Sequence, residues 1–137
     1  MIECAEIFKN HLFEALAELS DRDFQERIWA NKDNPEGWVT SFTEAAIQFW
    51  DDSLLSDALG RDAIIYDQRV TVALQELWNA IEPLEEYGRR PMEVINDPKM
   101  EIVRQKASEV LKLIESSDKS ENTVTFLEEG TLQVLQP

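Results

Sequence analysis

Several residue types are scarce in this sequence, and each scarcity excludes a class of structure or chemistry. The 137 residues include a single cysteine, Cys4, so no disulfide can form within the chain, which fits a reducing compartment. The chain has only four glycines, and it contains neither the glycine-rich motif of dinucleotide-binding proteins nor that of nucleoside-triphosphate-binding proteins. No apolar run approaches the roughly 18 residues of a transmembrane helix, and the start, MIECAEIFKN, lacks the basic and apolar regions of a signal peptide. We therefore expect a cytoplasmic protein.

Basic residues are also few. Lysine and arginine number 13 against 28 aspartates and glutamates, which gives a formal net charge of −15. A chain this acidic repels phosphates, so we expect no direct binding to nucleic acid and no binding to a membrane. The surplus of carboxylates instead favours a positively charged protein partner.

Length and hydrophobic content indicate one folded domain. Hydrophobic residues make up 43% of the chain and aromatic residues 9%, which is too rich for a disordered segment. A chain of this length buries about two thirds of its unfolded surface and can fold unaided. We therefore expect a single domain over residues 1–137.

Three stretches have the periodicity of an amphipathic helix. Apolar residues recur at spacings of three and four over residues 3–19, over residues 62–81, and after Asp97-Pro98 as far as Ile114. Asp97 suits the N-cap position and Pro98 the first helical position. The pattern predicts three long helices.

Capping signals predict shorter helices between the long ones. Ser20 is a candidate N-cap for a helix that ends near Asn31. The segment from Ser41 to Glu44 matches a capping box, in which both side chains bond to the first free amides of a helix that runs to about Trp50.

The C-terminal segment changes period from about 3.6 to two. Residues 123–135 alternate apolar and polar side chains on either side of Gly130, which is typical of a β-hairpin. A lone hairpin is only marginally stable in water, so this one should pack on the helices. The predicted fold class is mainly α, a compact bundle of about five to six helices with a C-terminal β-hairpin.

Candidate catalytic residues do not form a convincing set. The single histidine, His11, could be a metal ligand or a general base, but we favour its interpretation as an ordinary helix residue. Cys4 lies about two helical turns away, too far to exchange a proton with His11. A row of aspartates recurs at every fifth position: Asp52, Asp57, Asp62 and Asp67, with Asp51 beside the first. Five residues turn a helix by about 500°, so these side chains would point in different directions and would not converge on a di-metal site. We expect no enzyme activity, no cofactor and no metal.

Acidic residues beside aromatic ones are the most informative pattern. Residues 1–60 carry 13 acidic and 4 basic side chains and three of the four tryptophans. An aromatic ring among carboxylates can anchor and steer a basic protein surface, although tryptophans can equally belong to the core. The candidate partner-binding residues are Asp33, Glu36, Trp38, Trp50, Asp51, Asp52, Asp57, Glu85, Glu86 and Tyr87.

In charge, size and these acidic–aromatic clusters, the chain resembles the immunity proteins that bacteria keep against nuclease toxins of the colicin and contact-dependent growth inhibition types. The resemblance is one of type, and it implies a mechanism of occlusion. An acidic surface would fill the basic cleft that a nuclease uses to hold phosphates, or a patch beside it. We therefore expect an acidic inhibitor of a basic toxin.

The sequence is also compatible with two other hypotheses for the function. A nucleic-acid mimic, such as a phage antagonist of a restriction or CRISPR complex, would also display many carboxylates, but in rows with phosphate-like spacing. A non-enzymatic helical adaptor subunit would expose a large apolar patch for an obligate partner.

Overall fold

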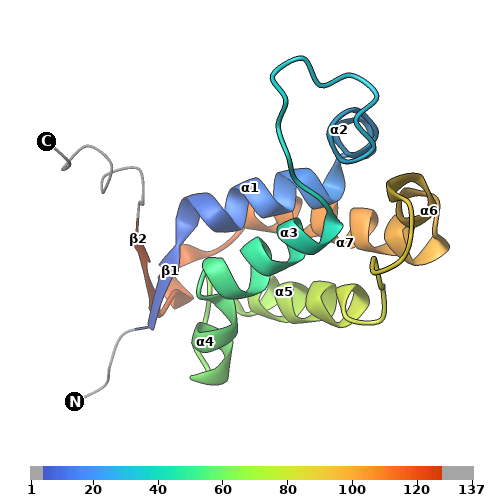
Figure 1. Cartoon of the computed structure of the whole chain (residues 1–137). Coiled ribbons are helices and arrows are strands. Elements are labelled where there is room, and N and C mark those ends of the chain that lie inside the picture. Colours follow the sequence, from blue (N-terminus) through green and yellow to red (C-terminus); the bar gives the residue numbers. More distant parts are fainter. Residues whose placement is uncertain (1–4, 128–137) are drawn as a thin grey trace, which may run out of the picture.

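The structure, a computed structural model, describes residues 5–127 and is dominated by helices (Figure 1). Seven α-helical segments lie within these residues, three of them longer than ten residues. The α-helices are α1 Lys9–Ser20, α2 Arg22–Phe24, α3 Phe42–Ile47, α4 Leu55–Gly60, α5 Gln68–Ile81, α6 Pro91–Ile95 and α7 Pro98–Glu115. The remaining elements are the strands β1 Ala5–Phe8 and β2 Val124–Leu127, the π-helical turns η1 Gln25–Trp29 and η2 Gln48–Asp52, and the 3-10 turn η3 Lys119–Glu121.

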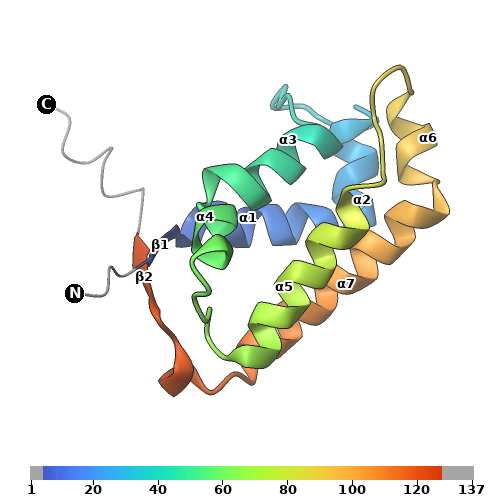
Figure 2. The same cartoon turned by 90° about the horizontal axis from the view of Figure 1, so that it is seen from below.

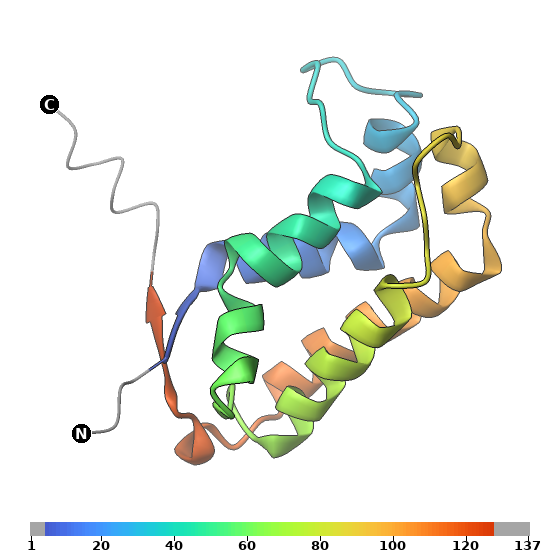
Figure 3. The same cartoon turned by 60° about the horizontal axis from the view of Figure 1, so that its bottom comes forward.

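The helix α7 is the central packing element. It lies alongside α5, as Figures 2 and 3 show, and it also packs against α1. The helix α3 continues into η2 and lies against α1. The buried side chains of all these helices belong to one hydrophobic cluster, so the described residues share a single core.

The helix α5 illustrates how the sequence pattern produces the packing. Its buried residues Val70, Leu74, Leu77 and Ile81 recur at spacings of three and four and form one stripe. The expected helix over residues 62–81 is wrong at its start, because α5 begins only at Gln68. Two residues before that start have left-handed φ angles of 59° and 67°, which a right-handed helix does not accommodate: Asp62 and Tyr66.

The start of the first predicted helix is also corrected. Residues 5–8 form the strand β1, not the first turn of the helix expected over residues 3–19. The strand pairs in parallel with β2, with Ala5 opposite Val124 and Ile7 opposite Phe126. The alternation of buried Ala5, exposed Glu6 and buried Ile7 fits a strand, and its partner lies at the far end of the chain.

The C-terminal strand confirms the predicted change of period. Val124–Leu127 is extended, and within the described residues its partner is β1. The turn at Gly130 and the second strand of the expected hairpin lie outside the described residues. The mainly helical fold with a small terminal sheet is confirmed.

Helix starts largely follow the capping signals. The Ser41 hydroxyl accepts the Glu44 amide at 3.2 Å, and an Asp97 carboxylate oxygen accepts the Lys99 amide at 2.8 Å. At the second helix the expected cap is wrong by one residue. The Asp21 carboxylate is the cap, because Ser20 belongs to the last turn of α1 and donates its hydroxyl to the Ala17 carbonyl.

Candidate functional site

A loop over residues 30–41 projects from the helices (Figure 1) and carries an exposed tryptophan, Trp38. The Trp38 side chain is 57% exposed. Its backbone is nevertheless held in place, because its amide donates to Asn34 Oδ1 at 3.0 Å and its carbonyl accepts Asn34 Nδ2 at 2.6 Å. Gly37, with a φ of +70°, supplies the left-handed step that this turn requires. The ring is thus exposed on a backbone that is already ordered.

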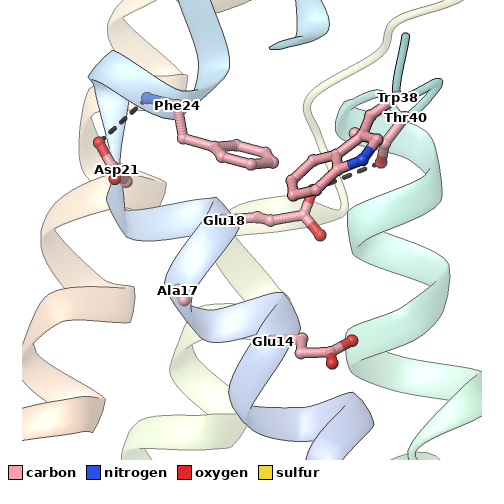
Figure 4. A pocket seen from close by; sticks show the side chains of 7 residues that line it. All are labelled: Glu14, Ala17, Glu18, Asp21, Phe24, Trp38 and Thr40. Atoms are coloured by element: carbon pink, nitrogen blue, oxygen red, sulfur yellow. Dashed lines mark hydrogen bonds between the residues drawn. The ribbon is translucent and has the colours of Figure 1, made fainter. Parts of the chain in front are cut away.

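The Trp38 indole overlies a pocket between the loop and the first two helices. In Figure 4 the rings of Trp38 and Phe24 point toward one another above the Glu18 carboxylate. The pocket encloses about 460 Å³ and is open to solvent. Its lining, here called the Trp38 pocket, consists of Glu14, Ala17, Glu18, Asp21, Phe24, Trp38 and Thr40.

Glu18 is the half-buried carboxylate at the centre of the Trp38 pocket. Burial raises the pKa of this half-buried side chain, and hydrogen bonds from Trp29 and Thr40 oppose that rise in part. The Trp29 indole N–H and the Thr40 hydroxyl both donate to Oε1, at 3.4 Å and 3.3 Å. Within residues 5–127 no side chain or amide donates to Oε2. The carboxylate is therefore oriented by its neighbours and keeps one oxygen for a ligand.

The electrostatics of the Trp38 pocket are one-sided. Three carboxylates line it and no lysine or arginine does. The two carboxylates beside Glu18 also have local partners, since Glu14 accepts a hydrogen bond from Gln48 Nε2 at 3.0 Å and Asp21 accepts one from the Phe24 amide at 3.1 Å. The arrangement can attract a cation and shelter its apolar part. Among the described residues, no group of three or more His, Cys, Asp or Glu side chains is placed to hold a metal.

The sequence identified Trp38 but missed most of the pocket around it. The candidates Asp33 and Glu36 lie exposed on the same loop but do not line the pocket. A signal for the missed carboxylates was present, because Glu14, Glu18 and Asp21 follow one another at spacings of four and three on α1 and its cap. Like charges at these spacings destabilise a helix, so such a row calls for an explanation.

A second groove is lined by one of the predicted residues, Asp51, and has another, Glu86, beside it. It encloses about 290 Å³ between α3 and α5, and its lining includes Asp51, Trp78 and Glu82. Near its other end Glu86 accepts the Thr43 amide at 3.0 Å. The acidic segments after α3 and after α5 therefore lie along one groove, although they are far apart in the sequence.

Trp50 has a packing role in this groove's wall. Its ring is half-buried and stacks face to face on Trp78, with centroids 4.4 Å apart and parallel planes. It also lies against buried Phe49, at 6.3 Å. The ring offers less free surface than Trp38 and contributes to the core.

The remaining candidates are dispersed. Asp57 pairs with Arg61 at 2.9 Å on α4, which lies at the opposite end of α3 from the Trp38 loop (Figures 1 and 3). Asp52 and Glu85 are exposed, and Tyr87 is 98% exposed on the connection after α5. These residues do not join the Trp38 pocket.

Within residues 5–127, His11 has no cluster of metal-ligating side chains around it. His11 is half-buried on α1, with Nδ1 3.4 Å from Gln48 Nε2 and its ring edge-on to Phe8 at 6.0 Å. Cys4 lies outside the described residues. Of the acidic row at five-residue spacing, Asp67 is buried as the cap of α5, so the row is not a ligand cluster.

Comparisons with known proteins leave the site to be understood from its own geometry. No protein-family model matches the chain, and no curated protein or solved structure matches it either. In the part of the chain that the structure describes, no helix is long and apolar enough to cross a membrane.

Proposed function

We propose that this chain is a cytoplasmic inhibitor of the immunity-protein type, which binds a basic protein partner and has no catalytic activity of its own. One observation carries the proposal. An exposed tryptophan on an ordered backbone stands at a pocket with three carboxylates and no cation in its lining. Such a site satisfies the two requirements of a tight complex with a basic surface, an apolar anchor and a complementary charge.

The anchor and the charge act on different steps of binding. A tryptophan that enters a desolvated interface contributes about 2 kcal/mol or more when it is a hot spot, and this affects mainly dissociation. The net charge of −15 attracts a basic partner over a distance and can raise the association rate by about 10- to 1,000-fold at low salt. The two effects can be measured separately.

A nuclease-type toxin domain is the partner that this chemistry fits best. Its substrate cleft must be basic because it holds phosphates. The Trp38 pocket and the groove beside Asp51 lie on either side of the chain segment 40–43, since Thr40 lines the first while Phe42 and Thr43 line the second. A partner that covered this segment would meet both acidic sites, and occlusion of the cleft would follow.

The gathering of these charges favours an inhibitor over a nucleic-acid mimic. A mimic needs carboxylates in rows at phosphate-like spacing. Here carboxylates cluster around an aromatic ring and along one groove, while Asp57 is paired with Arg61. The mimic is retained as an outcome of the experiment below.

The experiment captures the partner and then measures its binding. The immobilised full chain is exposed to a lysate of the cells that encode it. Captured basic proteins are then purified and assayed for nuclease activity with and without this chain. We expect a basic nuclease that is inhibited at equimolar ratio and associates more slowly as salt rises above about 0.1 M. Trp38→Ala should lose about 2 kcal/mol or more of affinity, while Val39→Ala, the neighbouring exposed residue outside the pocket, should lose none.

Charge reversal tests the steering. Asp51→Lys combined with Asp52→Lys should slow association without changing the fold. A salt-insensitive association rate, or an inhibited partner with no excess of basic residues, would contradict the proposal. Capture of a nucleic-acid-binding complex that is not a nuclease would support the mimic instead.

A further inference from the structure

We infer that the Trp38 pocket receives an arginine side chain. The inference rests on the proposed function for the protein that supplies this arginine, but the preference of the pocket can be measured without that protein. It follows from the shape of the pocket, from the character of its walls and from the state of its central carboxylate.

The walls of the pocket suit a flat cation with an apolar stem. Phe24 and Trp38 present their rings to the opening from two different segments, and the small side chain of Ala17 leaves space between them and α1 (Figure 4). A guanidinium is planar and weakly hydrated, so it stacks on aromatic faces more readily than an ammonium does. Its methylene stem can lie on the same apolar surface.

The central carboxylate suits the donors of a guanidinium. Thr40 and Trp29 hold Glu18 through Oε1, which leaves Oε2 without a donor among residues 5–127. Because desolvation raises the pKa of Glu18, the ionised carboxylate is undercompensated in the free protein. A guanidinium would supply that compensation through charge-assisted hydrogen bonds, which are about twice as strong as neutral ones.

The neighbouring carboxylates extend the preference for arginine. Glu14 lies one helical turn before Glu18 and Asp21 lies at the helix end after it, so two further carboxylates line the same pocket. An arginine presents five N–H donors in a fixed fork and can engage more than one of these acceptors. A lysine ammonium is more strongly hydrated and would lose more solvation in a half-buried site.

The experiment uses four small probes and the full chain. The amides of arginine, lysine, citrulline and norleucine are titrated while the tryptophan indole N–H signals are followed by NMR. Each probe is N-acetylated, so that only the arginine and lysine side chains carry a charge, and citrulline is the neutral isostere of arginine. Trp38→Phe assigns the Trp38 signal among the four. We expect arginine amide to move the Trp38 signal with a dissociation constant in the millimolar range, as one side chain allows, and the neutral probes to leave it unchanged.

Two matched carboxamide variants locate the charge. Glu18→Gln keeps an oxygen for Thr40 and Trp29 but removes the negative charge, and it should weaken arginine amide by roughly tenfold. Glu36→Gln removes a carboxylate that lies on the Trp38 loop but outside the pocket, and it should change the affinity for arginine amide less than twofold. The spectrum of each variant shows whether it is folded, and Glu14→Gln, expected to weaken binding by a smaller factor, replaces Glu18→Gln if that variant unfolds.

Each result separates this inference from the proposed function. If citrulline amide binds as well as arginine amide, the pocket is an apolar site, and if lysine amide does, it is a general cation site. If no probe moves the Trp38 signal, the pocket does not bind arginine. Any of these results overturns the inference. If arginine amide binds while no basic partner is captured, the pocket assignment stands and the proposed function fails. If the partner binds in a salt-dependent way but arginine amide does not, the converse holds.

Discussion

Arg104 on α7 permits a quantitative test of how the wall of the Trp38 pocket is supported. This arginine is 6% exposed, and its Nη1 donates to Gln25 Oε1 at 2.9 Å and to the Ile95 carbonyl at 3.1 Å. Gln25, which is fully buried, in turn donates to the carbonyls of Glu18 and Leu19 at 2.8 Å and 3.0 Å. The network thus connects α7 to the end of α1 that carries the central carboxylate.

The magnitude follows from the acceptors that the substitution leaves without a donor. Arg104→Met keeps most of the aliphatic stem but orphans two acceptors, Gln25 Oε1 and the Ile95 carbonyl, at about 1–3 kcal/mol each. The ionic partner Glu101 is 54% exposed and is solvated again by water, so it adds little. We expect a loss of about 2–6 kcal/mol from the free energy of unfolding, a large share of the roughly 5–15 kcal/mol typical of a domain.

Urea unfolding followed by tryptophan fluorescence measures this loss. A decrease of about 3 kcal/mol lowers the midpoint by about 1 M or more, since slopes for small proteins are about 1–3 kcal/mol per M. Lys106→Met is the matched control, because it removes a cation from the same helix at a half-buried position whose side chain makes no hydrogen bond within residues 5–127. Its midpoint should stay close to that of the wild type.

A double-mutant cycle decides whether the network acts as described. Gln25→Leu combined with Arg104→Met should cost less than the sum of the two single changes, because Gln25→Leu removes the acceptor that Arg104→Met orphans. Additive costs, or a midpoint in Arg104→Met that matches the Lys106→Met control, would refute the reasoning.

Two further predictions concern packing and pH. Trp50→Ala should lower the free energy of unfolding by roughly 2 kcal/mol through loss of the stack on Trp78, while arginine amide still binds; thermal unfolding and the NMR titration check this, and loss of arginine binding would contradict it. The amides of Val70 and Asp118 donate to the Asp67 carboxylate and are the main reason that its pKa lies below the usual value. The stability that Asp67 contributes is therefore present at pH values above the usual pKa of an aspartate, and it is lost as the pH falls through the lowered pKa. Asp67→Asn should therefore flatten the loss of stability in acid, and parallel acid unfolding curves for variant and wild type would count against this cause.

Where the determining contacts are local, the sequence predicted the structure well. The Asp97 cap and the stripe of α7 involve residues within about four positions of one another, so the pattern alone indicates the helix. The strand β1 was missed for the opposite reason. Residues 5–8 are compatible with a helix face, and only β2, at the other end of the chain, makes them extended.

In the candidate site too, local sequence identified some residues and contacts between distant segments decided the others. Trp38 was identified because a tryptophan beside glycine and two acids in a loop is unusual in the sequence itself. Phe24 was not identified, because nothing in the sequence around it marks it as part of a pocket. Only the fold of the second helix against the loop places its ring at the pocket opening.

The sequence by itself determined the charge of the protein, its helical class and the position of several helix starts, because these depend on composition and on side chains a few residues apart. The tertiary structure alone decided which tryptophan is free and which is packed, and which carboxylates share a pocket. The physical reason is that burial and proximity arise from contacts between distant segments, such as Trp50 with Trp78 and Glu18 with Trp29 and Thr40.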